Sequence, residues 1–150
     1  MTGKHYVLLL IMGILHFVAM FGLMYAMVDT ATDVFANFNQ AYMAGLMTAP
    51  MLILEVALMG AMYPDKRWNA LIGGASALAL VVLFVCIRQQ TWIGDRQFLR
   101  SMIPHHSGAI LMCERASITD PEIKELCKTI VLGQQSEIDQ MKAILNRLGQ

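Results

Sequence analysis

Methionine and histidine are the residues of this sequence that could do chemistry. Methionine occurs 13 times in 150 residues, and Met102, His105 and His106 stand within five positions of one another. On a helix Met102 and His105 share a face, and Met112 follows two turns later. Thioether sulfur and neutral imidazole are the ligands that suit Cu(I) and, by extension, Ag(I). His106 points about 100° away from His105 on a regular helix, so both imidazoles reach one ion only through a distortion or a second subunit.

Two helices must position these residues. The first is predicted over about 95–116, and Pro104 either kinks it or restarts it, because proline removes a backbone hydrogen bond. The second starts after Thr119 or Asp120, either of which can cap it, with Pro121 in its first turn. Gly149 is the expected stop. The C-terminal region is therefore predicted to form a long antiparallel hairpin that turns at 117–120.

The two helices are expected to face each other along rows of residues spaced by four and three. These rows are Phe98, Met102, His105, Ala109, Met112 and Ala116 in the first helix, and Ile123, Cys127, Ile130, Gln134, Glu137, Met141, Ile144 and Leu148 in the second. This register brings His105 opposite Gln134 and Met102 near Glu137. Buried polar groups cost about 1–3 kcal/mol each unless paired. His105, Gln134 and Glu137 would lie at the same height along the two helices, so together they indicate a site. Because two helices cannot enclose it, we expect self-association into a four-helix bundle or docking on membrane helices.

Three other interpretations of these residues stay open. Methionines often fill gaps in a core, with His105 hydrogen-bonded by Gln134 or Glu137. A zinc site would combine both adjacent histidines with Cys113 and Cys127, but the spacing is not that of a familiar zinc motif. Alternatively, the two cysteines form a disulfide that joins the helices. A di-iron carboxylate bundle would need Glu-x-x-His motifs, and the sequence has none.

The C-terminal third resembles a known bacterial family. Residues 98–112, Phe-Leu-Arg-Ser-Met-Ile-Pro-His-His-Ser-Gly-Ala-Ile-Leu-Met, followed by Gln135-x-Glu137-Ile138-x-x-Met141, are similar to the domain-of-unknown-function family numbered 305. The resemblance implies half of a ferritin-like four-helix bundle, often exported, and a copper-associated role. It implies metal-ligand roles for Met102, His105, His106, Met112 and Met141. Gln134, Gln135 and Glu137 are candidate supporting residues.

This chain departs from the family pattern at three points. Larger members carry the motif twice, whereas this chain carries it once, which favours a homo-oligomer. Ser107 stands where the family often has Gln, and Leu111 where it often has Asp. The absence of an aspartate at position 111 alters the charge expected near the site.

The rest of the chain has the composition of a membrane protein. Hydrophobic residues make up 57% of the sequence and charged residues 15%, against about 45–50% and about 25% in soluble domains. Apolar runs at about 6–28, 43–63 and 68–87 are each near the roughly 20 residues that a membrane helix needs. The first run exceeds the apolar core of a signal peptide. We therefore predict a transmembrane region over 1–87 and a helical metal-binding domain over 88–150.

The short loops predict the orientation in the membrane. Lys4 precedes the first span, and Lys66 and Arg67 lie between the second and third, whereas the loop 29–42 has no Lys or Arg. The positive-inside rule places the N-terminus in the cytoplasm. With three spans, the C-terminal domain lies on the periplasmic side of a bacterial inner membrane.

Methionines also repeat every four residues inside the predicted spans. The series are Met12, His16, Met20 and Met24 in the first span, and Met43, Met47, Met51, Glu55 and Met59 in the second. Ionisable groups in a bilayer usually face a partner or a cavity, so a path for Cu(I) and a Glu55–His16 pair are both options. Residues spaced by four rotate by about 40° around a helix at each step, so the series does not stay on one face. This favours structural packing of the methionines over a metal path.

Composition narrows the function classes. The net charge is 0 and no basic stripe is present, so nucleic-acid binding is not expected. No catalytic constellation is present, so we do not expect an enzyme. We expect a membrane-anchored protein that binds Cu(I) or Ag(I) for tolerance, storage or hand-off, with zinc less favoured. The alternative is a structural module whose hairpin oligomerises or docks a partner without metal.

Overall fold

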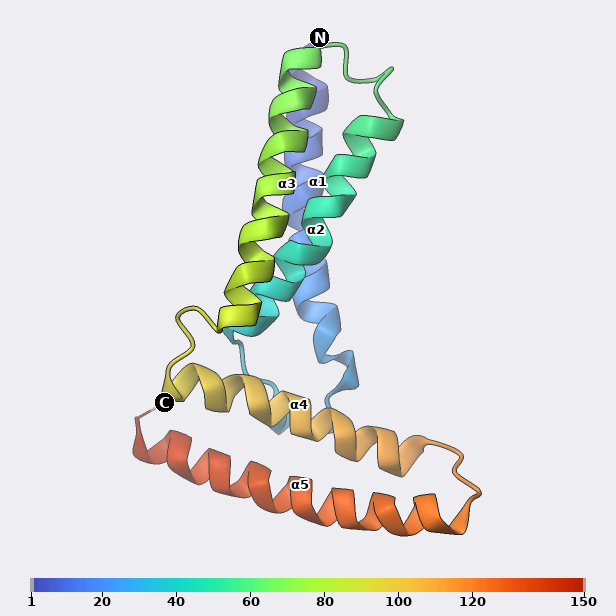
Figure 1. Ribbon diagram of the computed structural model, residues 1–150, viewed down its shortest axis with the longest axis vertical. Coiled ribbons are helices and arrows are strands. Elements are labelled where there is room, and N and C mark those ends of the chain that lie inside the picture. The colour runs from blue at the N-terminus through green and yellow to red at the C-terminus, as the bar shows by residue number, and fades with distance from the viewer. Residues whose placement is uncertain (1, 150) are drawn as a thin grey trace. The chain divides into compact units, whose positions relative to one another are not determined.

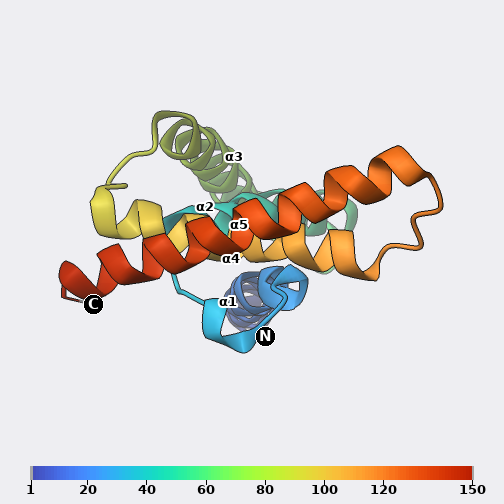
Figure 2. The ribbon, with the colours of Figure 1, turned by 90° about the horizontal axis from the view of Figure 1, so that it is seen from below.

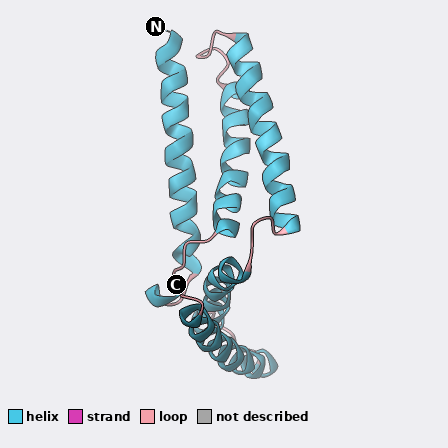
Figure 3. Ribbon diagram, turned by 90° about the vertical axis from the view of Figure 1, so that its left-hand side faces the viewer, coloured by secondary structure: helices cyan, strands magenta, loops and turns pink. Residues whose placement is uncertain are grey.

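The computed structural model describes residues 2–149, and every regular element in them is helical (Figures 1 and 3). The all-α prediction is confirmed. In these residues the α-helices are α1 (Thr2–Leu23), α2 (Phe38–Leu58), α3 (Lys66–Gln89), α4 (Asp95–Arg115) and α5 (Pro121–Arg147). Two short 3-10 turns, η1 (Met24–Met27) and η2 (Ala31–Asp33), lie between α1 and α2.

Three stretches are long and apolar enough to span a membrane: Gly3–Met27, Phe38–Leu58 and Lys66–Gln89. Their large apolar side chains are mostly exposed, as at Leu58, which is 78% exposed. Such exposure suits a lipid environment rather than water. The second span begins and ends earlier than the predicted range 43–63, and residues 59–62 form a bend and turn directly after α2. These helices indicate a membrane protein.

The chain divides into two compact units, and the first holds the spans. It consists of residues up to Met24 together with Asn39–Thr91. Its buried core is formed by Leu9, Val56 and Tyr63. The ring of Tyr63 lies 5.5 Å from that of Tyr6, centroid to centroid. The hydroxyl of Tyr6 donates to Oδ1 of Asn69 at 2.8 Å. Side chains at one end of the spans thus tie the three helices together.

The second unit consists of Tyr25–Phe38 and the residues from Trp92 onward. Helices α4 and α5, the α4–α5 pair, lie side by side and run in opposite directions (Figures 1 and 2). They enclose a core of Leu99, Ile103, Ile110, Ile138, Met141 and Leu145. Of these six residues, Met141 alone belongs to the rows that the sequence predicted to face each other.

The ends of α4 and α5 follow local sequence signals. Oδ1 of Asp120 accepts hydrogen bonds from the backbone N–H groups of Glu122 and Ile123, with Pro121 as the first helical residue. Asp120 is therefore the cap, rather than Thr119. Gly149 has φ +71°, a conformation that glycine adopts without strain, and α5 ends just before it, as predicted. Helix α4 continues through Pro104 without a break.

The predicted facing row of α4 is wrong by one residue, whereas that of α5 is buried or half-buried at Cys127, Gln134 and Met141 but exposed at Glu137. In α4 the buried row is Leu99, Ile103, His106 and Ile110, and in α5 it contains Ile138, Met141 and Leu145. Both rows of α4 satisfy the same four-and-three spacing. The observed one carries more branched aliphatic carbon, and each buried CH₂ is worth about 0.8 kcal/mol. His106, not His105, therefore enters the interface.

Candidate functional site

His106 is the buried histidine of the α4–α5 pair. The residue is 8% exposed, and its Nδ1 lies 2.9 Å from the backbone oxygen of Met102, one turn earlier in α4. Because a carbonyl oxygen only accepts hydrogen bonds, Nδ1 must carry a proton. This bond fixes the orientation of the ring and directs Nε2 toward α5.

Nε2 of His106 meets a carboxylate from the other helix. It lies 2.8 Å from Oε2 of Glu137, and the Glu137 side chain is 57% exposed. One proton lies in this contact, carried by the ring or by the carboxyl, since two bare lone pairs would repel each other. The partly exposed glutamate can turn to solvent, whereas the imidazole is held inside. Nε2 is thus the nitrogen that a ligand could reach by displacing that proton.

Two methionines flank this contact. Met102 is one turn before His106 in α4, and Met141 is one turn after Glu137 in α5. Met141 is 9% exposed and belongs to the buried core, and Met102 packs against that core. The core between the two helices therefore includes a methionine from each of them, and thioethers together with an imidazole are soft donors that suit Cu(I).

The other predicted ligands lie on the surface. His105 is exposed, and its ring centroid lies 6.0 Å from that of His106 with the planes 64° apart. Met112 is 54% exposed. Of the predicted ligands, His106 and Met141 are thus buried in the α4–α5 pair and Met102 packs against its core, while His105 and Met112 are exposed.

Of the three predicted supporting residues, Glu137 contacts a candidate ligand. Gln134 is half-buried in the row that faces α4. The exposed Gln135 donates from Nε2 to Oδ1 of Asp139 at 2.9 Å, which engages it on the surface of α5. The predicted pairing of His105 with Gln134 is replaced by the pairing of His106 with Glu137, a consequence of the shifted rows.

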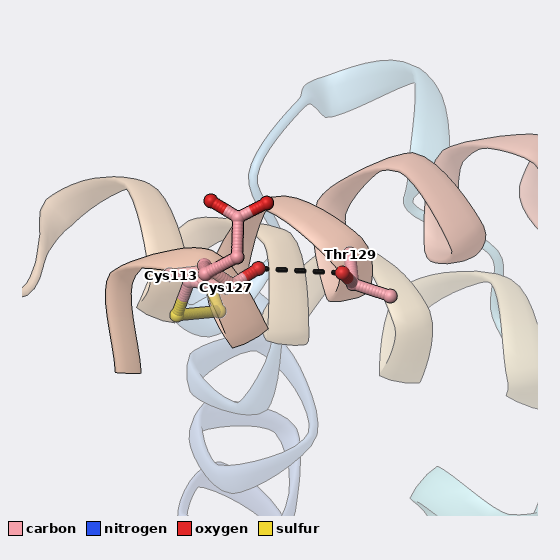
Figure 4. Close-up of a disulfide and its surroundings, with 4 residues drawn as sticks. Cys113, Cys127 and Thr129 are labelled. Carbon is pink, nitrogen blue, oxygen red and sulfur yellow. Dashed lines mark hydrogen bonds between the residues drawn. A yellow bond between two sulfur atoms is a disulfide. The ribbon is translucent and has the colours of Figure 1, made fainter. Parts of the chain in front are cut away.

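Cys113 and Cys127 form the disulfide that the sequence allowed, and this prediction is confirmed (Figure 4). Their Cα atoms are 5.3 Å apart, and 14 positions separate them in the sequence. The bridge joins α4 to α5 near the connecting loop. In this oxidised form the two sulfur atoms are not free thiolates, so a zinc site built on them would require reduction. Across residues 2–149, no cluster of three or more His, Cys, Asp and Glu side chains is placed to hold a metal.

The segment between α1 and α2 packs against α4 next to His106, a contact that the sequence analysis did not predict. The hydroxyl of Ser107, fully buried, accepts a hydrogen bond from the backbone N–H of Asp29 at 3.0 Å. A Cβ at Gly108 would lie 3.2 Å from the backbone oxygen of Met27, so glycine permits this close approach. The immediate chain neighbours of His106 therefore hold the segment 25–38. The small residues after the two histidines were the signal for this contact.

Asp33 is the charged centre of that contact. It is 5% exposed and forms an ion pair with Lys142, the residue after Met141. Burial by itself raises the pKa of Asp33, but hydrogen bonds from Lys142, Ser107 and Thr30 and the charge of Lys142 together hold the pKa below its ordinary value. The carboxylate is therefore ionised, and it ties both helices of the pair to the segment 25–38.

Comparison with known proteins relates both parts of the chain to others. Residues 88–145 match the model of the family described as "Domain of unknown function (DUF305)". "Uncharacterized protein L153" of Acanthamoeba polyphaga mimivirus is 32% identical over 142 residues, covering 93% of this chain and 91% of that protein. A match of this length necessarily includes the apolar helices as well as the α4–α5 pair. No solved structure is significantly similar to this chain.

Proposed function

Since this chain belongs to the family described as "Domain of unknown function (DUF305)", we propose that it is a membrane-anchored protein that binds Cu(I), or the similar Ag(I), through its α4–α5 pair. Metal tolerance, storage or hand-off is the role that such binding would serve. The proposal includes no catalytic step.

The orientation of His106 is the observation that carries the proposal. A histidine that ligates a metal through one nitrogen usually donates the other N–H to a carbonyl or carboxylate, which fixes the tautomer. In His106 the Nδ1–Met102 carbonyl bond supplies this arrangement. Nε2 is directed at Glu137 on the facing helix.

Binding would exchange a proton for the metal ion. The proton between Nε2 of His106 and Oε2 of Glu137 leaves, and the partly exposed Glu137 turns toward solvent. Met102 and Met141 supply neutral sulfur ligands that need no deprotonation. The ion would thus be bound by one imidazole and two thioethers, with Glu137 near enough to balance its charge.

The exposed ligands have a separate role in this proposal. His105 and Met112 face solvent and could receive an ion or pass it to a second copy. Apolar side chains on the same pair are also exposed, including Ile123 at 49% and Leu126 at 56%. Association of two α4–α5 pairs into a ferritin-like four-helix bundle would cover them. We therefore include a homo-oligomer in the proposal.

The proposed location is the bacterial inner membrane, with the N-terminus cytoplasmic and the α4–α5 pair periplasmic. The Cys113–Cys127 disulfide supports this side, because such bonds persist in oxidising compartments. The contacts of Asp29 and Asp33 with the α4–α5 pair also support it, since they require the loop after the first span and the region after the third to share one side of the membrane.

One observation favours the alternative of a structural module without metal. Both ring nitrogens of His106 already have partners, Met102 and Glu137. A buried polar pair of this kind can fix the register of two helices by itself. In that case α4 and α5 would oligomerise or bind a partner protein, and their methionines would only fill the core.

An anaerobic Cu(I) titration of the full chain in detergent, against a competing chelator, separates the two functions. Replacing His106 by Ala and Met102 by Leu should weaken binding by about tenfold or more. His5→Ala and Met62→Leu are matched controls, because both residues lie outside the α4–α5 pair. Equal Cu(I) affinity in the parent and the double variant would exclude this site and leave the structural module.

A further inference from the structure

A groove of about 460 Å³ runs along α2, in the unit that holds the apolar helices. Its lining is Met47, Pro50, Met51, Leu54, Glu55, Leu58 and Met59. Three methionines and a glutamate spaced by four residues therefore open onto one groove, although each step of four drifts by about 40° around a helix. Met43, the first member of this series, does not line it.

Glu55 is the ionisable group of the groove. Its Oε1 accepts a hydrogen bond from the hydroxyl of Tyr63 at 3.2 Å, and Tyr63 is itself anchored in the core at 5% exposure. Within residues 2–149, no Lys, Arg or His side chain forms an ion pair with Glu55. A carboxylate inside a membrane span is expensive unless a cation or a proton neutralises it. The fold thus places a carboxyl group beside three methionines of the groove without pairing it to a basic side chain of the described residues.

The methionines of the groove are not part of the hydrophobic core. The core of this unit is centred on Leu9, Val56 and Tyr63, with Tyr6, Met12, Leu52 and Ile72 packed against it. Met47 and Met59 are each 42% exposed instead. Gap-filling in a core therefore does not account for their position.

This donor set fits a soft cation of charge +1. Thioethers are neutral, so a site made only of methionine would leave the charge of Cu(I) or Ag(I) uncompensated in the membrane, whereas Glu55 cancels it. Met51 and Glu55 are one helical turn apart, about 6 Å along the axis, and Met47 and Met59 lie one turn further on either side. Calcium, in contrast, takes about six to eight oxygen ligands, and the side chains of this groove offer one carboxylate.

We propose that the groove on α2 is a second site for a soft monovalent cation, Cu(I) or Ag(I), centred on Met51 and Glu55 and flanked by Met47 and Met59. It goes beyond the function proposed for the α4–α5 pair and does not depend on it, because every residue of the groove lies on α2 or, for Met59, directly after it. A chain with both sites would bind more than one ion.

Ag(I) binding by the full chain in lipid nanodiscs tests this site. The background is a variant in which His106→Ala and Met102→Leu remove the first site. In this background, Met51→Leu with Glu55→Gln should lower Ag(I) affinity by about tenfold or more. Met43→Leu is the matched control, since it makes the same substitution on the same helix outside the groove, and it should leave the affinity unchanged.

The outcomes distinguish failure of the groove site from failure of the α4–α5 site. The groove is supported if the background variant binds Ag(I) and this binding is lost when Met51→Leu and Glu55→Gln are added. If the background variant binds no Ag(I) while the parent does, the groove is excluded and the α4–α5 site stands. An equal loss with Met43→Leu also overturns the proposal, because it would trace the effect to packing of α2. If both parent and background bind with equal affinity, the α4–α5 site fails and the groove survives.

Discussion

His106 on α4 and Glu137 on α5 share one proton across 2.8 Å, and this polar contact lies beside a core of hydrophobic side chains between the two helices. The ring is almost buried, whereas the carboxylate reaches solvent. This asymmetry lets one partner move without the other. The contact can therefore act as a structural link in one state and as an opening for a ligand in another.

Replacing His106 should cost much more stability than replacing its neighbour. His106→Ala removes a buried ring and the Glu137 bond, so we expect a loss of about 1–3 kcal/mol. His105→Ala changes an exposed side chain and should stay within about 0.5 kcal/mol. Urea unfolding of both variants, followed by hydrogen exchange in α4 and α5, measures the difference. Equal losses would mean that the assignment of the buried histidine is wrong.

Glu137→Gln separates the structural role of the contact from metal binding. The amide can still donate to Nε2 of a neutral imidazole, so the expected loss of stability is small, about 0.5–1.5 kcal/mol. Cu(I) should then bind without displacing a shared proton, and its affinity should depend less on pH than in the parent. The measurement is the chelator competition repeated at several pH values. A complete loss of Cu(I) binding would instead make Glu137 a ligand.

The parts of the fold that sequence predicted are those fixed by local signals. Apolar runs of about 20 residues are hard to place anywhere but in a membrane, and Asp120, Pro121 and Gly149 act on backbone groups within a few residues of themselves. The Cys113–Cys127 disulfide could also be foreseen, because these two cysteines fall in the polar third of the chain. None of these predictions depended on which faces of α4 and α5 meet along their length.

The row of α4 residues that faces α5 could not be predicted in the same way. Rows starting at Phe98 and at Leu99 have the same spacing, and choosing between them requires the areas that each buries. Ser107 looked like a departure from the family pattern. It is instead a contact with the segment 25–38, which lies about 80 positions away in sequence. Such contacts depend on which distant segment packs against α4, and the small residues Ser107 and Gly108 indicate a close approach without saying which segment makes it.

Reducing the disulfide should loosen the end of the α4–α5 pair. A bridge that closes a loop of about 15 residues contributes about 3 kcal/mol, so Cys113→Ser with Cys127→Ser should lower the unfolding midpoint of this region. Cys86→Ser is the control, because Cys86 is a free cysteine of α3. The check is thermal unfolding of both proteins with and without a reducing agent. An unchanged midpoint after reduction would show that the helices are held without the bridge.

The Asp33–Lys142 ion pair should make the attachment of the segment 25–38 sensitive to acid. The pKa of Asp33 in the folded protein is below its ordinary value of 3.8. A depressed pKa contributes stability that is fully present above the unfolded value and is lost as the pH falls through the folded value. Hydrogen exchange in residues 25–38 should therefore be slow at neutral pH and rise, relative to the intrinsic rate, below about pH 4.

Two variants test the sign and the cause of this effect. Lys142→Met leaves the buried carboxylate unpaired, so it should destabilise the attachment at neutral pH and raise the pKa of Asp33. Asp33→Asn with Lys142→Met removes both charges and should lose less stability than Lys142→Met alone, because no buried charge remains unpaired. Its exchange in residues 25–38 should no longer change with acid. A double variant as acid-sensitive as the parent would assign the effect to another carboxylate.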